Sequence, residues 1–393
     1  MNTPKIRFKG FADDWEQSKV SELFRVTRGY VLAATQTNTT KTDEKPYPVY
    51  SSQTKDKGLM GYYKDYLYED AITWTTDGAN AGTVNYRAGK FYCTNVCGVL
   101  LSNEVKANQM IAEALNNVAK GYVSYVGNPK LMNNVMADIV IQIPTQAEER
   151  EMLSSLFASL DHLITLHQRK CDETKQLKKF MLQKMFPKNG EKNPEIRFEG
   201  FTDDWEQRKL GEVSSKITKK NQDIVVDEVF TNSAEYGIIS QRDFFDKDIA
   251  NFENIDGYYI VEPNDFVYNP RISTTAPFGP IKRNKLERTG AMSPLYYVFR
   301  PHDIDLSYLE CFFQTSCWHT FMRFNGNTGA RSDRFAITDK VFDEMPISMP
   351  QDIEEQQKIG SYFSSLDNLI TLHQRKCEKL KELKKYMLQN MFV

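Results

Sequence analysis

The chain has 393 residues, of which 40% are hydrophobic and 26% charged, and its mean hydropathy is −0.54. This length is enough for two or more domains with separate cores, and the composition is that of a globular rather than a disordered protein. A formal net charge of −2 argues against a uniformly basic nucleic-acid-binding protein, and no apolar run approaches the roughly 18 residues of a membrane helix.

In chain order, the first feature is a short aromatic segment that occurs twice. Residues 4–19 read PKIRFKGFADDWEQSK and residues 194–209 read PEIRFEGFTDDWEQRK, an offset of 190. We name these two stretches the IRF segments. Their isoleucine, phenylalanine and tryptophan positions predict buried anchors, because such side chains are usually found in protein interiors. We interpret the repeated Asp-Asp-Trp as structural rather than catalytic.

Each IRF segment is followed by a long region in which the two halves of the chain diverge. These variable regions, about residues 21–144 and 212–350, consist of short β-type runs broken by turn signals, and both are predicted to be mixed α+β domains. In the first, we expect a helix over 105–119 and strands near 47–50, 71–75, 82–86 and 96–101. In the second, we expect a single helix over 306–324 and strands near 236–239, 258–261, 266–268 and 295–299.

The sequence repeats again after each variable region, now at an offset of 206. Residues 131–144 read LMNNVMADIVIQIP and residues 337–350 read ITDKVFDEMPISMP. A helix is predicted to begin after each final proline, and Asp352 is a typical N-cap residue for the second one. Each helix is predicted to extend for about 35 residues.

The two predicted helices share an almost identical stretch of eleven residues. It reads LDHLITLHQRK at 160–170 and LDNLITLHQRK at 366–376, with apolar positions at alternating steps of three and four. This spacing is typical of a coiled coil, so we expect the two helices to pair specifically with each other. If they lie antiparallel, the variable domains are placed at opposite ends of a rod. A repeated surface helix with a core stripe is the alternative. The expected contact positions of the coiled coil are Leu160, Leu163, His167, Leu177, Leu366, Leu369, His373, Leu380 and Leu383.

The fold class expected from this layout is α+β, with a pseudo-two-fold internal repeat of two mixed domains separated by two long antiparallel helices. Residues 1–147 should comprise the first IRF segment and variable domain, and residues 148–187 the central long helix. Residues 188–352 should comprise the second IRF segment and variable domain, and residues 353–393 the C-terminal long helix.

The sequence lacks the motifs expected of an enzyme. Asn269-Pro270-Arg271 lacks the second proline of the amino-methyltransferase motif, and a phosphate loop ending at Lys90 would need glycine where Val84 stands. The six cysteines show no metal-ligand spacing and no disulfide framework. We therefore expect no catalytic residue and no metal in this chain. The first residues have no signal-peptide character, so we expect a cytoplasmic protein.

In their order and duplication, these features resemble the specificity subunit of type I restriction-modification systems, and the resemblance covers the whole length. It rests on the PxIRFxGFxxDWEQ pattern of the IRF segments, the Pro-then-Glu-Glu openings of the helices at Pro144 and Pro350, and the LITLHQRK helices. The resemblance implies two target recognition domains, each of which reads one half of an interrupted, asymmetric DNA site. It implies that the long helices form the spacer between them.

The resemblance also implies the partners of the chain. The long helices would dock two methyltransferase subunits that bind S-adenosylmethionine and methylate adenine N6. Translocating endonuclease subunits would join the complex, and ATP and magnesium would be bound there rather than by this chain. Two other functions stay open from the residues alone: a structural coiled-coil adaptor that does not recognise DNA, and a self-sufficient DNA-modifying enzyme with unrecognised motifs.

We expect the DNA contacts from polar and basic loop residues of the variable domains. Lysine, arginine and hydroxyl side chains suit phosphates, whereas Arg, Asn, Gln and Thr can read base edges. In the first domain the candidates are Gln53, Lys55, Lys57, Thr76, Asp77, Asn80, Arg87 and Lys90. In the second they are Arg271, Ser273, Thr274, Lys282, Arg283, Lys285, Asn327, Arg331, Ser332 and Arg334. The alternative is that these loops are plain connections or a solvated edge.

Overall fold

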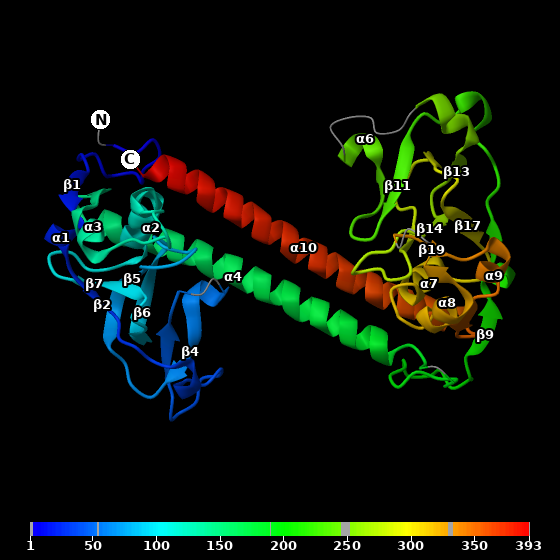
Figure 1. The fold of residues 1–393 in the computed structure, drawn as a ribbon, viewed down its shortest axis with the longest axis horizontal. Coiled ribbons are helices and arrows are strands. Elements are labelled where there is room, and N and C mark those ends of the chain that lie inside the picture. The colour runs from blue at the N-terminus through cyan, green and yellow to red at the C-terminus, as the bar shows by residue number, and fades with distance from the viewer. Residues whose placement is uncertain (1–2, 53–54, 189, 245–251, 329–332, 393) are drawn as a thin grey trace. The chain divides into compact units, whose positions relative to one another are not determined.

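The protein is described here by a computed structural model that covers residues 3–52, 55–188, 190–244, 252–328 and 333–392 (Figure 1). The chain divides into two compact units. Unit 1 consists of Met1–Arg169 with His373–Val393, and unit 2 consists of Lys170–Leu372.

Two long helices contribute residues to both units. Helix α4 (Ala147–Lys184) has 38 residues and helix α10 (Ile353–Met391) has 39, close to the predicted lengths. The expected N-cap is present, because the Asp352 carboxylate accepts a hydrogen bond from the Glu354 N–H at 2.8 Å. The compact units divide the chain within both helices, so each unit contains part of α4 and part of α10.

A six-stranded sheet forms the centre of unit 1, in the order β2-β7-β5-β6-β3-β4. Neighbouring strands are antiparallel except β3 and β6, which are parallel. The strands are β2 (Phe24–Arg28), β3 (Tyr47–Tyr50), β4 (Leu59–Tyr63), β5 (Tyr68–Thr75), β6 (Val84–Cys93) and β7 (Cys97–Ser102). Helix α2 (Gln109–Ala119) covers the sheet, since its Ile111 and Leu115 share one core with Ile72 and Trp74 of β5.

Unit 2 contains two four-stranded sheets, in the orders β10-β17-β14-β15 and β12-β11-β16-β13. The first consists of β10 (Ser214–Lys216), β14 (Phe266–Tyr268), β15 (Ile281–Arg283) and β17 (Tyr297–Pro301). The second consists of β11 (Val229–Ser233), β12 (Gly237–Ser240), β13 (Tyr259–Val261) and β16 (Gly290–Met292). Phe266, Phe299 and Phe342 belong to the main core, whereas Phe230 and Met292 belong to a second, smaller core.

The helix predicted over 306–324 is two helices. Helix α7 (Leu306–Phe312) ends before a turn, and α8 (His319–Asn325) begins after it. The Thr315 hydroxyl donates to the Phe312 carbonyl at 2.6 Å and accepts from the Cys317 N–H at 3.2 Å. These local side-chain bonds replace helical ones, which is how threonine competes with a helix.

The tryptophan of each IRF segment is buried as predicted, whereas the isoleucines Ile6 and Ile196 are each 37% exposed. In unit 1, Trp15 is 2% exposed and packs edge-on against Phe392. In unit 2, Trp205 packs in the same way against Phe186. Each segment then enters a two-stranded sheet, β1 (Glu16–Lys19) with β8 (Val140–Ile143) and β9 (Glu206–Lys209) with β20 (Pro346–Met349).

The remaining elements are short. The helices are α1 (Val20–Leu23), α3 (Asn133–Asp138), α5 (Leu210–Val213), α6 (Gln241–Phe244) and α9 (Asp339–Asp343). The 3-10 helices are η1 (Ala34–Gln36), η2 (Lys55–Gly58), η3 (Lys120–Tyr122), η4 (Gln222–Ile224) and η5 (Phe252–Gly257). A small hairpin joins β18 (Asn327–Thr328) to β19 (Phe335–Ala336).

The long helices are antiparallel within unit 1. Asp161 of α4 pairs with Lys384 of α10 at 2.7 Å, and His167 Nδ1 lies 3.0 Å from His373 Nδ1. Residue numbers thus rise along one helix as they fall along the other.

The same direction of pairing holds within unit 2. There Lys178 of α4 pairs with Asp367 of α10, and Phe186 packs on Phe363. Lys178 and Asp367 are the repeat equivalents of Lys384 and Asp161, at the offset of 206, so the internal repeat extends to this ion pair.

The predicted contact positions of the coiled coil are wrong at every second step. Leu163, Leu177, Leu369 and Leu383 are 39%, 45%, 45% and 42% exposed, so they lie outside the contact. The buried or half-buried residue is the next one in each case: an isoleucine after Leu163 and Leu369, and a lysine after Leu177 and Leu383. The apolar pattern therefore fits both phases only where leucine and isoleucine are adjacent. The observed positions are Leu160, Ile164, His167, Cys171 and Thr174 in α4 and Leu366, Ile370, His373, Cys377 and Leu380 in α10.

Metal sites and membrane-spanning helices find no support in the described part of the chain. No group of three or more His, Cys, Asp or Glu side chains with metal-binding geometry occurs there. No described helix is long and apolar enough to cross a membrane. The six cysteines are free thiols, five of them buried.

Candidate nucleic-acid interface

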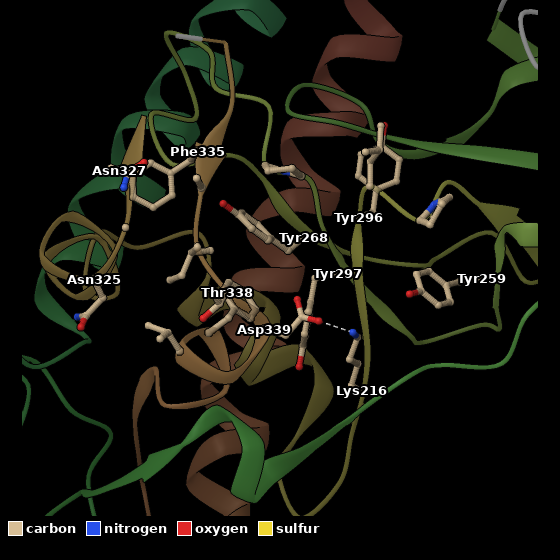
Figure 2. Close-up of a pocket in the computed structure, with 18 of the residues that line it drawn as sticks. Lys216, Tyr259, Tyr268, Tyr296, Tyr297, Asn325, Asn327, Phe335, Thr338 and Asp339 are labelled. Atoms are coloured by element: carbon tan, nitrogen blue, oxygen red, sulfur yellow. Dashed lines mark hydrogen bonds and ion pairs between the residues drawn. The ribbon is translucent and has the colours of Figure 1, made fainter. Parts of the chain in front are cut away.

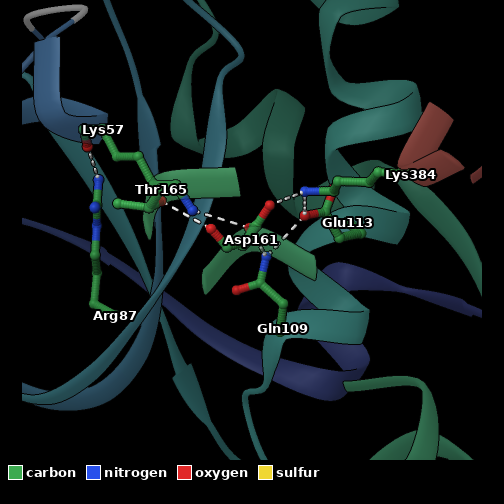
Figure 3. Close-up of polar contacts among 7 residues, drawn as sticks. All are labelled: Lys57, Arg87, Gln109, Glu113, Asp161, Thr165 and Lys384. Carbon is green, nitrogen blue, oxygen red and sulfur yellow. Dashed lines mark hydrogen bonds and ion pairs between the residues drawn. The ribbon is translucent and has the colours of Figure 1, made fainter. Parts of the chain in front are cut away.

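In unit 1, Lys57 belongs to the short helix η2 and has an unusual backbone. Asp56 and Lys57 have φ values of 48° and 52°, a left-handed conformation that side chains rarely adopt without support. Two contacts hold this turn (Figure 3): the Lys57 ammonium pairs with Asp161 at 2.9 Å, and the Lys57 carbonyl accepts a hydrogen bond from Arg87 at 2.6 Å. Lys57 is therefore positioned by α4 and β6 rather than mobile in solvent.

Asp161 is the centre of a charge network that the sequence reasoning missed. Its carboxylate also contacts Lys384 and accepts from Gln109, while Lys384 reaches Glu113 at 2.6 Å (Figure 3). Burial by itself would raise the pKa of Asp161, but the hydrogen bonds and charges of Lys384 and Lys57 outweigh it and hold that pKa below its usual value. The repeated Asp and Lys at an offset of 206 were the signal that could have revealed it.

Arg87, predicted as an accessible DNA-binding residue, lies in the interior. It is on strand β6, where it is 7% exposed, and its guanidinium stacks on the Tyr50 ring at 3.7 Å from the centroid. Its Nε donates to the Thr73 hydroxyl at 3.0 Å. The predicted strand over 82–86 continues to Cys93, so Arg87 points from a strand face and not from a loop.

The loop after β5 uses its candidate side chains to hold its own shape. Thr76 is 8% exposed and donates to Asp77 Oδ2 at 2.7 Å. Asp77 lies 3.7 Å from the Lys130 ammonium, and Asn80 donates to the Ser52 carbonyl at 3.0 Å. Asp77 and Asn80 stay accessible in part, whereas Thr76 does not.

Lys90 is an exposed candidate in unit 1. It lies over the Tyr66 ring at 4.6 Å from the centroid, and a hydrogen bond with Tyr66 raises the pKa of its ammonium. Four further candidates cannot be placed, because the structure does not describe them or their side chains. They are Gln53, Lys55 (side chain), Arg331 and Ser332.

In unit 2, two predicted loops run side by side. Arg271 and Arg334 form an antiparallel β-bridge, and the Ile272 N–H donates to the Asp333 carbonyl at 3.0 Å. Both arginines are exposed, so the structure brings two positive side chains from distant parts of the sequence to one surface. Three more candidates are exposed on the same two segments: Ser273, Thr274 and Asn327.

The basic run 282–285 is engaged in internal contacts. Lys285 pairs with Glu310 of α7 at 2.6 Å, and Arg283 donates to Asn264 at 2.9 Å. Lys282 is half-buried, and this burial lowers the pKa of its ammonium. These side chains are less available to a ligand than Arg271 and Arg334.

A cleft of about 640 Å³ lies next to the paired loops of unit 2 (Figure 2). The ammonium of Lys216 and the carboxylate of Asp339 pair at its wall. Four tyrosines also line the cleft, together with the candidate Asn327, so its wall combines aromatic faces with a few polar groups. The tyrosines are Tyr259, Tyr268, Tyr296 and Tyr297.

Each unit also exposes a set of apolar residues on its part of the long helices. In unit 2 these are Leu177, Phe180, Leu369 and Leu372, which are 45%, 49%, 45% and 45% exposed. Their repeat equivalents at the offset of 206 all lie in unit 1, where three of them are exposed by 39–55% and Leu166 is half-buried. The unit 1 set is Leu163, Leu166, Leu383 and Tyr386. We name each set an apolar quartet.

Comparisons with known proteins agree with this layout. A family model described as "Type I restriction modification DNA specificity domain" matches residues 12–176 and again residues 202–382. A putative type I specificity subunit from Mycoplasma pneumoniae is 36% identical over 141 residues, which are 35% of this chain and 74% of that protein. A second one from that organism is 37% identical over 116 residues, which are 28% of this chain and only 38% of that protein. The crystal structure of a type I restriction-modification system S subunit from M. genitalium has a similar fold, with a TM-score of 0.71 at 12% identity over 100% of this chain and 99% of that chain.

Proposed function

The chain belongs to the type I restriction-modification DNA specificity family, and we propose that it reads a bipartite, asymmetric DNA site with one variable domain on each half-site. One observation carries this proposal: a repeated frame, formed by the IRF segments and the long helices, surrounds two inserts, the variable domains, that have different sheet topologies. A repeated frame suits one common role performed twice. Inserts that share neither sequence nor topology suit the recognition of two different half-sites.

The DNA surface of unit 2 is assigned to the paired loops. Arg271 and Arg334 provide positive charge, and Ser273, Thr274 and Asn327 provide hydroxyl and amide groups beside it. This mixture suits phosphate contacts and base-edge contacts on neighbouring groups. In unit 1, Lys90 is the corresponding exposed cation in the described residues.

The apolar quartets are assigned to the docking of two methyltransferase subunits. Single exposed apolar residues need no explanation, but a set that recurs at equivalent positions in both units does. Two equivalent surfaces suit two copies of one partner. The inserts do not, because they differ in sequence and topology. We place adenine methylation, and the S-adenosylmethionine, ATP and magnesium of the complex, on partner subunits because the sequence of this chain lacks the corresponding motifs.

The function is tested by mapping methylated adenines in host DNA with and without the chain. A bipartite motif that appears only in its presence is the expected result. Exchange of residues 22–144 for those of a relative should alter one half of the motif and leave the other unchanged. An unchanged methylation pattern would leave a structural adaptor as the better description, and a change in both halves would contradict the modular assignment.

The docking surface is tested by the stoichiometry of the complex. Leu177→Glu with Leu369→Glu changes the quartet of unit 2 alone, and we expect the purified complex to keep one methyltransferase per chain in place of two. Gln176→Glu with Asn368→Glu introduces the same charges at exposed neighbouring positions and serves as control. Two methyltransferases bound to both variants would remove the quartets from the interface.

A further inference from the structure

One buried cation of unit 1, Arg87, has no counterion among the residues that the structure describes. Arg87 is 7% exposed, and burial is the main reason why the pKa of its guanidinium is lowered. Keeping a charge in the interior is costly unless it is paired and hydrogen-bonded. Yet within the described ranges of the chain no carboxylate forms an ion pair with Arg87. The guanidinium therefore lacks the partner that a purely structural arginine normally has.

The groups that do contact Arg87 are neutral. Nε donates to the Thr73 hydroxyl, Nη2 donates to the Lys57 carbonyl, and the Tyr50 ring covers one face. A guanidinium carries more N–H donors than these two hydrogen bonds use. Donors on a buried cation thus stay available to an acceptor from outside the protein.

Arg87 lines a cleft of about 230 Å³ that also has several polar side chains in its wall. Asn85 lies on the same face of β6 as Arg87, because alternate residues of a strand point to the same side. Asn80 and Thr83 line the cleft from the preceding loop, and Lys57 also lines it, with its ammonium paired to Asp161. The described lining contains no carboxylate, so the charge of the cleft is positive.

We propose that this cleft binds a phosphate group. Arginine with amide and hydroxyl donors is the usual environment of a phosphate, and a positive cleft repels metal cations. Because Arg87 is below the surface, a protruding phosphate reaches it more readily than the edge of a stacked base pair. The source of the group rests on the proposed function: a backbone phosphate of the DNA that unit 1 reads. A free phosphate ion has the same chemistry, and the test below separates the two.

The test uses a variant in which the protein itself supplies a carboxylate counterion to Arg87. Asn85→Asp places a carboxylate beside Arg87 without removing its contacts to Thr73 and Lys57, whereas Arg87→Met would also remove contacts that hold β6. We expect N85D to fold with at least the thermal stability of the native chain. Asn103→Asp, at an exposed position outside the cleft, makes the same change in charge and is the matched control.

The first measurement uses inorganic phosphate. At constant ionic strength, phosphate in place of chloride should raise the melting temperature of the native chain and of N103D but not of N85D. The second measurement uses a 40-base-pair duplex at several salt concentrations. Each phosphate contact contributes about 0.9 to the slope of log K against log salt, so a fourfold rise in salt should weaken N85D about 3.5-fold less than N103D.

The outcomes separate the two proposals. A reduced salt slope in N85D assigns the cleft to a DNA phosphate, and a phosphate response with unchanged slopes assigns it to a free phosphate. Equal phosphate responses and equal slopes in N85D and N103D would overturn the inference, with DNA reading by the chain intact. If the native chain binds no duplex and directs no methylation, the proposed function fails, while the phosphate measurement still decides on the cleft.

Discussion

The frames of the two units use half-buried arginines in the same way. Arg7 of unit 1 makes a two-pronged ion pair with Glu149 at 2.7 and 2.8 Å, and Arg197 of unit 2 makes the same pair with Glu355 at the same distances. Both glutamates are 1% exposed in their side chains. In the inserts this equivalence ends, because one has a single six-stranded sheet and the other two sheets of four strands. Arg87, buried in the first insert, has no carboxylate among the residues that the structure describes.

This contrast separates two uses of buried charge. In the frame, each arginine is satisfied internally, and its partner recurs in the other unit. In the insert of unit 1, Arg87 keeps donors for a group from outside. The ion pairs of Arg7 and Arg197, which recur in both units, hold the frame together. Arg87 has no repeat equivalent and no ion pair among the described residues, so it is available for binding.

The largest effect should come from breaking the paired frame. Glu149→Gln and Glu355→Gln each leave a nearly buried arginine without its counterion, which typically costs about 3–5 kcal/mol in the free energy of unfolding. Urea denaturation of the two variants should show similar losses. The loss in unit 2 should be the greater, because Glu355 also accepts from Trp205 Nε1 at 3.4 Å, whereas Trp15 Nε1 has no partner among the described residues. Losses below about 1 kcal/mol would contradict the role of these pairs.

A second comparison concerns neighbouring positions of one helix. Ile370 is 9% exposed and Leu369 is 45% exposed. Ile370→Ala should lower the free energy of unfolding by about 2–4 kcal/mol, and Leu369→Ala by about 0.5 kcal/mol or less. Leu369→Ala should instead weaken retention of a methyltransferase subunit. If Leu369→Ala destabilised the chain more than Ile370→Ala, the contact position expected from the sequence, Leu369, would be the correct one.

The acidic side of the pH profile tests the network around Asp161. Its pKa is lowered in the folded chain, so its contribution to stability is complete above the unfolded pKa of about 3.9 and is lost as the pH falls through the lower, folded value. Asp161→Asn should cost about 1 kcal/mol at neutral pH and less in strong acid. Equal costs at pH 7 and pH 2.5, measured by denaturant unfolding, would show that the carboxylate charge is not what stabilises the network.

The smallest effect should come from one exposed cation of the second insert. Arg271→Ala should leave the stability unchanged and reduce the salt slope of DNA binding by about 0.9, the contribution of one phosphate. If Arg271 reads a base instead, the methylated motif should relax at one position of one half-site. An unchanged slope and an unchanged motif would remove Arg271 from the interface.

Most of the architecture could be predicted from residues that recur. The tryptophans of the IRF segments, the starts of the long helices and the eight expected strands follow from local pattern, whereas strands such as β2, β4 and β10 were not expected. The single helix over 306–324 was wrong because the Thr315 hydroxyl forms local hydrogen bonds that no periodicity reveals. The candidate binding residues were less predictable, since a polar side chain between two turns can face solvent or its own loop, as Asn80 does.

The sequence by itself determined that this chain has a repeated frame, two long helices and two dissimilar inserts, because repetition and periodicity can be read directly from the order of residues. Only the tertiary structure decided which face of each helix is buried, since Leu369 and Ile370 fit the same apolar pattern and packing chooses between them. It also decided which charges are paired. The sequence does not distinguish Arg87 from Arg271, but the fold buries the first beside a cleft and exposes the second beside Arg334. The reason is that burial depends on residues that are distant in the chain.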